Sequence, residues 1–307
     1  MINMKVEIDS PIAINSKAQL LKMINVDDLI NRYQKKFKID VSYYFQNLKD
    51  IAIYKCNKTG YRFFYPFNIY GDSSFYEKLQ SFEWYYMPWK WEHSKVEGLL
   101  KDDERILEVG SGDFGFVEKL QNNDFDIFGL ELNKDSILKA KQLNLNVIDK
   151  SIESHAKEHP NSYDVVCSFQ VLEHIYDVRT FIQAQIDCLK KEGRLIVAVP
   201  NNDSFIKMSD GGLLNNPPHH MGLWNKTALK GLADCFNLKI EHIYYEPLQD
   251  YHVNWYIDSI IKSKIKPYKI INKIFNKLKL KRLLAKYVRL NQKNIKGHTI
   301  LAIYKKA

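Results

Sequence analysis

The chain has 307 residues, of which 45% are hydrophobic and 13% aromatic, so it can build a sizeable packed core in one or two domains. Its formal net charge is +9, but this charge is unevenly distributed. Residues 258–307 contain fifteen Lys or Arg and one acidic residue, so the preceding part of the chain is mildly acidic. An acidic main body disfavours nucleic acid as a partner.

The cysteines exclude some classes of protein. They are scattered along the sequence, which indicates reduced and mostly buried thiols rather than a disulfide framework or a cysteine-rich metal site. The four are Cys56, Cys167, Cys188 and Cys235. We therefore expect no bound metal. No run of 18 apolar residues is present, and the first seventeen residues lack the pattern of a secretory signal. The resulting expectation is a cytoplasmic protein without a transmembrane helix.

Short apolar runs alternate with helical patterns in the middle of the chain. The runs that we predict as strands are 104–109, 126–132, 146–148, 163–169, 193–200 and 238–247. The segments that we predict as helices are 115–123, 133–143 with Asn133 as its N-cap, the stretch up to Leu189, and 225–236. Such alternation predicts an α/β fold with a Rossmann-like, doubly wound parallel sheet, whose ligand-binding loops follow the carboxyl ends of the strands.

The remaining segments differ in composition. Residues 1–100 are crowded with Tyr, Phe and Trp and show no strand–helix rhythm, so we interpret them as an N-terminal accessory segment. Residues 101–307 then form the main domain. Within it, a basic helical insert at 248–296 separates the last predicted strand, 298–306, from the others.

The stretch "RILEVGSGDFGF" contains a G-x-G-x-x-G spacing, which is typical of dinucleotide-binding folds. Glu108 stands two residues before Gly110, where a carboxylate would repel a pyrophosphate but could reach loop N–H groups or a bound ammonium group. Glu131 follows at the end of the second strand and is placed to bind two ribose hydroxyls. Both NAD and S-adenosylmethionine carry such a ribose, so Glu131 alone leaves the cofactor open.

Two later stretches bear on this choice: "SFQVLEHI" at 168–175, after the fourth strand, and "GRLIVAVPN" at 193–201. Together with Glu108 and a final strand suited to antiparallel pairing, they resemble the class I S-adenosylmethionine-dependent methyltransferases over about residues 100–247 plus that strand. The resemblance implies a seven-stranded sheet with the last strand antiparallel, and S-adenosylmethionine as cofactor. It assigns the methionine moiety to Gly110 and Gly112, the ribose to Glu131, the adenine to Ser151 and Ile152, and the methionine end to Gln170.

The front segment is similar to a zinc-ribbon-like lead-in found in some sugar-modifying relatives. "YKCNKTGYRFFYP" at 54–66 keeps Cys56, but Thr59 occupies the second thiolate position, and residues 31–50 contain no cysteine. Structural zinc needs four ligands, so we predict a degenerate lead-in without zinc. Residues 71–92 resemble the part of that lead-in that closes over the cofactor; an aromatic packing layer is the alternative interpretation.

Methyl transfer to a hydroxyl requires a base, and histidine is favoured near neutral pH. We rank His220 first, then His219 and His174, against the alternative that these histidines only orient or pack. The preceding double proline predicts an extended backbone at 217–220, with the two adjacent imidazoles pointing in different directions.

The expected function is methyl transfer to a small polar acceptor, such as a nucleotide-linked sugar or glycan precursor. An NAD-dependent oxidoreductase is the enzyme alternative, and a non-catalytic membrane-surface or scaffold protein is the alternative from another class. Methylation of a nucleic-acid base is disfavoured because no Asn-Pro-Pro-Tyr type motif follows the fourth strand.

Within the basic insert, apolar residues recur at helical spacings between 260 and 290, with lysines between them and Pro267 as a break. This pattern suits three arrangements. The apolar face could pack on the enzyme's own body or on a second subunit in a homo-oligomer, or it could make a peripheral contact with an anionic membrane. Nucleic acid is the least favoured partner.

Overall fold

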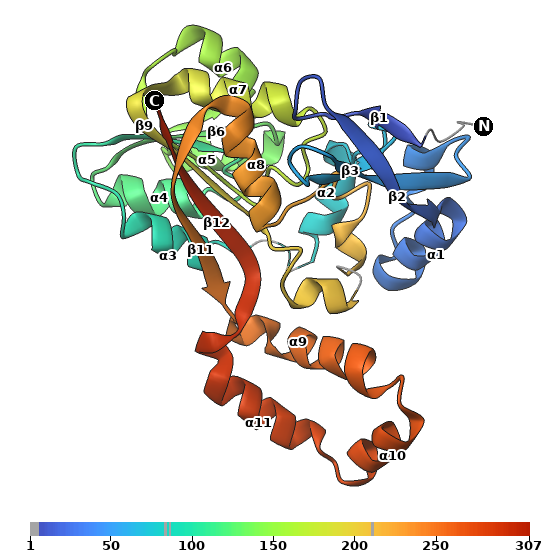
Figure 1. Ribbon diagram of the computed structural model, residues 1–307. Coiled ribbons are helices and arrows are strands. Elements are labelled where there is room, and N and C mark those ends of the chain that lie inside the picture. The colour runs from blue at the N-terminus through green and yellow to red at the C-terminus, as the bar shows by residue number, and fades with distance from the viewer. Residues whose placement is uncertain (1–5, 83–84, 86, 210–211) are drawn as a thin grey trace.

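The computed structural model describes residues 6–82, 85, 87–209 and 212–307, and the described chain forms two sheets (Figure 1). The larger has seven strands in the order β11-β12-β9-β8-β5-β6-β7. They are β5 (Arg105–Val109), β6 (Asp126–Glu131), β7 (Val147–Asp149), β8 (Tyr163–Phe169), β9 (Leu189–Pro200), β11 (Leu238–Pro247) and β12 (Lys296–Lys306). β5 to β9 pair in parallel, whereas β12 is antiparallel to both neighbours. The predicted seven-stranded sheet with an antiparallel last strand is confirmed.

Helices cover both faces of this sheet. They are α3 (Trp91–Glu97), α4 (Gly115–Asn122), α5 (Lys134–Gln142), α6 (Ile152–Glu158), α7 (Val178–Cys188) and α8 (Lys226–Phe236). Successive residues of a strand point to opposite faces, so Ile106 packs with α3, α4 and α5, and Leu107 packs with α6, α7 and α8. The Asn133 side chain accepts a hydrogen bond from Ser136 N, which confirms the predicted N-cap of α5.

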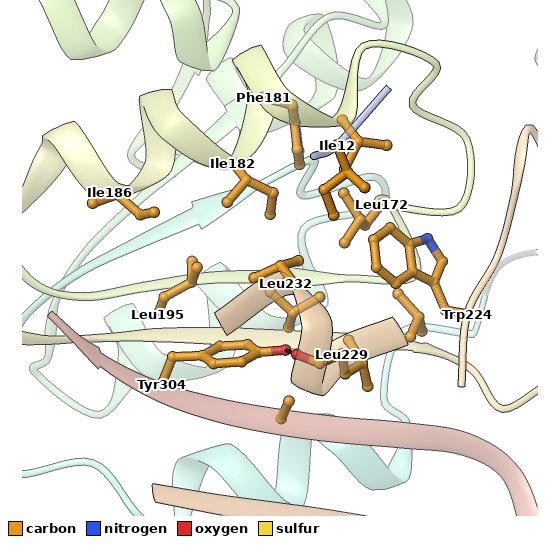
Figure 2. Packing of buried hydrophobic residues seen from close by; sticks show 14 of the residues in the cluster. Ile12, Leu172, Phe181, Ile182, Ile186, Leu195, Trp224, Leu229, Leu232 and Tyr304 are labelled. Atoms are coloured by element: carbon orange, nitrogen blue, oxygen red, sulfur yellow. Dashed lines mark hydrogen bonds between the residues drawn. The ribbon is translucent and has the colours of Figure 1, made fainter. Parts of the chain in front are cut away.

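Figure 2 shows the apolar core between α7, α8 and the sheet. Phe181 and Ile182 of α7 face Leu232 of α8, and the Tyr304 hydroxyl of β12 donates a 2.9 Å hydrogen bond to the Leu229 carbonyl. Burial of each such side chain stabilises the fold by about 1.5–3 kcal/mol. Ile12 enters the same cluster, so the N-terminal segment is packed directly on the main domain.

Residues 6–82 contain regular structure that the sequence analysis did not predict. The smaller sheet runs β1-β2-β3-β4-β10 and is antiparallel. Its elements are β1 (Glu7–Asp9), β2 (Lys17–Asn25), β3 (Asp50–Cys56), β4 (Arg62–Tyr65) and β10 (Gly222–Leu223), with helices α1 (Val26–Phe37) and α2 (Ser73–Gln80). Because β10 comes from the main domain, its pairing with β4 ties the N-terminal segment to that domain. Phe64 N of β4 also donates a hydrogen bond to Met221 O.

Short 3-10 turns connect these elements at η1 (Ser42–Phe45), η2 (Phe205–Ser209), η3 (Leu213–Asn215), η4 (Asp250–His252) and η6 (Gln292–Asn294).

The Cys56 thiol contacts Thr59 N at 3.4 Å and Ser16 Oγ at 3.7 Å. The likeness of residues 54–66 to a zinc ribbon stays an interpretation.

The basic insert is helical, as predicted. It consists of α9 (Val253–Ile260), a π turn (Ile261–Ile265), α10 (Lys269–Lys277) and α11 (Lys281–Asn291), with Pro267 in the break before α10. Figure 1 shows α9 and α11 side by side and α10 at the end farthest from the sheets. Every helix in the described part of the chain is too short or too polar to cross a bilayer.

Candidate active site

A cavity of about 1660 Å³ lies at the carboxyl ends of β5, β6, β8 and β9. All of the site residues predicted from the sequence line it: Glu108, Gly110, Gly112, Glu131, Ser151, Ile152, Gln170, His174, His219 and His220. Ligand cavities in proteins usually measure about 300–1000 Å³, so this one has room for a cofactor together with a second molecule.

The turn after β5 depends on its first glycine. Gly110 has φ +78°, and a Cβ atom added there would lie 2.6 Å from Cγ2 of Val171. Gly110 N and Ser111 N both donate to the Leu130 carbonyl, at 2.9 and 3.0 Å. A side chain at Gly110 would therefore be both strained and crowded, and glycine keeps the loop backbone open to the cavity.

Glu131, at the end of β6, holds this loop. Its Oε2 accepts from Gly112 N at 2.7 Å, and its Oε1 accepts from Leu132 N and Asn133 N at 2.8 Å each. Charge-assisted hydrogen bonds of this kind are stronger than neutral ones. One carboxylate thus ties the loops after β5 and β6 together at the cavity wall. Glu108 was expected to reach either the loop N–H groups or a bound ammonium group; it is Glu131 that accepts from Gly112 N.

Glu108 is only 3% exposed and lines the same cavity. Its Oε2 has no hydrogen-bond partner among the described residues. Burial raises the pKa of Glu108 well above its usual range, because the ionised carboxylate loses its hydration. A bound ammonium group would supply the missing partner, so this orphaned oxygen fits the amino group of a methionine moiety.

Two more predicted contacts lie on either side of the glycine loop. Ser151 caps α6 by accepting from Ser154 N at 3.3 Å, and Ile152 is buried beside it. Gln170 follows β8 in a left-handed conformation at φ +56°. Its Nε2 donates to Glu92 Oε1 at 3.1 Å and to Thr299 Oγ1 at 3.3 Å, so the amide is fixed at the cavity wall.

The three candidate histidines form one cluster, with ring centroids 4.5–4.9 Å apart. The prediction of an extended backbone at 217–220 is wrong. Residues 217–219 form a turn, in which the N–H groups of His219 and His220 both donate to Asn216 O. The prediction that the two imidazoles diverge is also wrong, because the turn stacks them at 20° and both line the cavity.

Hydrogen bonds assign the protons of these rings. His220 Nδ1 donates to Asn215 Oδ1 at 3.0 Å, which leaves Nε2 as the basic nitrogen. His219 Nδ1 donates to Leu214 O at 2.8 Å, and its Nε2 accepts from the Tyr85 hydroxyl at 2.9 Å. His174 Nδ1 donates to the His219 carbonyl at 2.6 Å. His219 therefore already uses both nitrogens.

Burial sets the charge of the cluster. It lowers the pKa of His174 to about 4 and the pKa values of His219 and His220 well below 6.5, because an imidazolium would lose its hydration. All three rings are therefore neutral at pH 7, and each has one ring nitrogen that carries no proton. Their ligand atoms lie within 4.8 Å of one another, but His219 and His220 are stacked nearly parallel, whereas tetrahedral zinc needs donors that converge. This stacked arrangement fits a tetrahedral metal ion poorly.

Sequence reasoning missed a second polar group in the cavity. Tyr251, His252 and His298 line it, and burial lowers the pKa of His252 to about 4 and of His298 to about 3. The Tyr251 hydroxyl donates to Glu246 Oε1 at 3.3 Å, and burial raises the pKa of Glu246 to about 7. The one sequence signal for this group was the polar pair His298 and Thr299 at the start of the apolar last strand. Asn215, also missed, stands five residues before His220.

The strand order, the glycine loop and Glu131 define the class of protein: a Rossmann-like α/β domain with a site for an adenosine-type cosubstrate. Residues 84–243, more than half of the chain, match the family described as "Methyltransferase domain". The chain belongs to this family, and its cofactor is S-adenosylmethionine. The predicted class I methyltransferase is confirmed, and family membership decides against the NAD-dependent alternative.

Known proteins resemble the chain over part of its length. The ubiquinone biosynthesis O-methyltransferase of Pectobacterium carotovorum is 27% identical over 116 residues, which cover 36% of this chain and 48% of that protein. The protein of the same name from Serratia proteamaculans is 25% identical over 170 residues, which cover 48% of this chain and 69% of that protein. The chain thus spans about half the length of the first relative. A SAM-dependent methyltransferase from Archaeoglobus fulgidus shares the fold at a TM-score of 0.50 and 17% identity, over 70% of this chain and 91% of that one.

Proposed function

We propose that the protein transfers the methyl group of S-adenosylmethionine to a hydroxyl oxygen of a small polar acceptor, with His220 as the base. The observation that carries this proposal is the position of the His220 ring, which is held by Asn215 and lines the same cavity as the glycine loop. The relatives' designation as O-methyltransferases supports an oxygen acceptor.

For the cofactor, we infer contacts from the residues that line the cavity. Glu108 would pair with the ammonium group, Glu131 would bind the ribose hydroxyls, and Gln170 would border the methionine end. Gly110 and Gly112 would admit the methionine moiety, and Ser151 and Ile152 would flank the adenine. When bound, S-adenosylmethionine supplies an electrophilic methyl carbon on a sulfonium.

The protein's own contribution would be orientation and proton transfer. The cavity walls align the acceptor oxygen for an in-line displacement, which removes much of the entropic cost of the reaction. His220 accepts the hydroxyl proton at Nε2 while its Nδ1–H stays bonded to Asn215, so the ring needs no reorientation. His219 is a weaker candidate because Tyr85 already donates to its Nε2. His174 would orient the pair, since its Nδ1 donates to the His219 carbonyl.

For the acceptor, we infer a nucleotide-linked sugar or glycan precursor. Two features support it: the likeness of the N-terminal segment to the lead-in of sugar-modifying relatives, and the polar side chains of Glu92, Tyr251 and His298 on the cavity wall, which can bond sugar hydroxyls. We retain residues 1–100 as the accessory segment and 101–307 as the methyltransferase domain.

Isothermal titration calorimetry tests both halves of the proposal. S-adenosylhomocysteine should bind saturably and NADH should not; saturable NADH binding without S-adenosylhomocysteine binding would overturn the reaction. A set of nucleotide sugars is then titrated in the presence of S-adenosylhomocysteine. If none binds while the cofactor product does, the sugar assignment fails and the methyl-transfer assignment stands.

A further inference from the structure

Residues 253–291, from α9 to α11, form a segment that we call the basic hairpin. Figure 1 shows it extending away from both sheets, with α10 at its far end. It begins at the cavity, since Trp255 of its first turn and the preceding residues Tyr251 and His252 all line that cavity. The hairpin therefore joins the wall of the cavity to a remote surface.

The inner side of the hairpin is already packed. Ile257 of α9 and Val288 of α11 are buried in a small apolar cluster with Phe205 and Leu248 of the body. Lys281 also pairs with Asp258 at 2.8 Å across the two helices. These contacts attach α9 and α11 to each other and to the body. Packing on the enzyme's own body is one of the arrangements expected from the sequence. It explains the buried inner side of the hairpin but not its outer side.

The outer side carries large apolar residues that are exposed to solvent. Six of them are between 51% and 77% exposed: Ile270, Ile274 and Leu278 along α10 and the turn after it, and Leu283, Tyr287 and Leu290 along α11. Spacings of three and four residues put each trio on one side of its helix. Contiguous exposed apolar stripes of this kind mark interaction surfaces.

A basic residue directly precedes each of these six apolar residues. The pairs are Lys269–Ile270, Lys273–Ile274, Lys277–Leu278, Arg282–Leu283, Lys286–Tyr287 and Arg289–Leu290. Neighbours in a helix are about 100° apart, so Lys269 and Lys273 lie beside the α10 stripe. Arg282, Lys286 and Arg289 lie beside the α11 stripe in the same way. Residues 259–296 contain thirteen Lys or Arg and no Asp or Glu.

The combination of exposed apolar residues with adjacent cations decides among three possible partners of the hairpin: a second copy of the chain, a nucleic acid and an anionic membrane. A second copy of the hairpin would bring the same dense positive charge against itself, which is repulsive. A nucleic acid would satisfy the cations but leave the isoleucines and leucines against phosphate groups. An anionic bilayer satisfies both features, because its headgroups attract the cations and its acyl boundary accepts the apolar side chains.

We propose that the basic hairpin docks the protein on the surface of an anionic phospholipid membrane, with the six apolar residues at the acyl boundary and the adjacent cations at the headgroups. The inference goes beyond the proposed reaction and does not depend on it. A docked hairpin would link the cavity wall at Tyr251 and Trp255 to the membrane surface.

Vesicle sedimentation of the full chain at low salt tests the proposal. Vesicles of phosphatidylcholine alone are compared with phosphatidylcholine vesicles that contain about 30% phosphatidylglycerol. The protein should bind the anionic vesicles and remain in solution with the neutral ones. The variants Ile270→Ser/Ile274→Ser and Lys269→Gln/Lys273→Gln should each weaken binding by about tenfold or more. Matched controls on α5 and its C-cap residue, Leu138→Ser/Leu143→Ser and Lys139→Gln/Lys141→Gln, should bind like the parent, since these leucines are similarly exposed.

Three results would overturn the proposal: no binding to anionic vesicles, equal binding to both vesicle types, or equal losses for the α5 controls. A stable dimer by analytical ultracentrifugation that the Ile270→Ser/Ile274→Ser change dissociates, with no vesicle binding, would assign the stripe to a second subunit instead. Titration of S-adenosylhomocysteine with every variant separates this outcome from failure of the proposed reaction, because cofactor affinity reports on the cavity and not on the hairpin.

Discussion

The Nδ1 atom of His220 lies 3.0 Å from Oδ1 of Asn215, and the amide nitrogen of Asn215 donates to Asn202 Oδ1 at 2.7 Å. The second bond fixes which end of the Asn215 amide faces the histidine. An amide oxygen only accepts, so the proton of the neutral imidazole sits on Nδ1 and the lone pair on Nε2. Asn215 is therefore a positioning residue for the proposed base.

The first prediction concerns this pair. Asn215→Leu should lower kcat by roughly 10–100-fold and leave affinity for S-adenosylhomocysteine unchanged, because the basic tautomer is no longer held; His220→Ala should cost about 10²–10⁴-fold. Initial rates with the acceptor found by titration measure both. Asn215→Asp keeps an acceptor but adds negative charge, which stabilises the imidazolium and should move the acid limb of the kcat–pH profile to higher pH. An unmoved limb would leave Asn215 a purely structural role.

The second prediction concerns Glu131, which accepts three backbone N–H groups at the cavity wall. Glu131→Ala should weaken binding of S-adenosylhomocysteine by about 2–3 kcal/mol, through lost ribose contacts and a loosened loop. Calorimetry of the variant and the parent gives this difference. Glu131→Gln keeps one carbonyl acceptor and should fall between the two. Parental affinity in Glu131→Ala would remove this residue from the site.

The third prediction concerns Gly110, whose left-handed φ and short approach to Val171 leave no room for a side chain. Gly110→Ala should destabilise the fold by about 1–3 kcal/mol, and should weaken cofactor binding, since the loop must shift. Urea unfolding and calorimetry measure the two effects. Gly98→Ala is the matched control, because Gly98 has φ −71° and its nearest atom would be 3.7 Å from an added Cβ. Equal losses in both variants would contradict the crowding argument.

Much of the methyltransferase domain was predictable because its strands are short apolar runs bounded by turns. Buried parallel strands such as β5 and β8 leave a continuous apolar signature, and Asn133 marks the start of α5 by its capping chemistry. The residues at the ends of these strands meet at one edge of the sheet. That geometry favoured a shared site for Glu108 and Glu131, whereas Gln170 was assigned to it by the resemblance to class I methyltransferases; all three line the cavity.

The N-terminal sheet and the histidine geometry were not predictable for a physical reason: both depend on contacts between segments distant in the sequence. β4 gains a partner from residues 222–223, about 160 positions away, and aromatic strands such as Arg62–Tyr65 give no clear alternation. The stacking of His219 on His220 follows from a turn closed on Asn216, whereas the double proline alone indicates an extended chain.

Glu173 offers a test of burial beside the proposed base. It is 1% exposed, its Oε2 has no hydrogen-bond partner among the described residues, and burial raises its pKa to about 8. Its carbonyl oxygen accepts from Met221 N and Gly222 N, so the residue lies where β10 joins the loop that carries the histidines.

The fourth prediction follows from the sign of that shift. The carboxyl is protonated in the folded protein up to about pH 8 but ionises near pH 4.5 when unfolded, so its contribution to stability is present at low pH and is lost as pH rises through this window. Glu173→Gln removes the titration, and the free energy of unfolding of the variant relative to the parent should rise by up to about 1.4 kcal/mol per pH unit between pH 5 and pH 7. Urea unfolding at both pH values measures the difference, and any fixed cost of the amide cancels in the comparison. Glu241→Gln, at an exposed position of β11, reports the effect of losing a surface carboxylate. A difference that stays constant with pH would show that Glu173 is already ionised in the folded protein, with a counter-charge nearby.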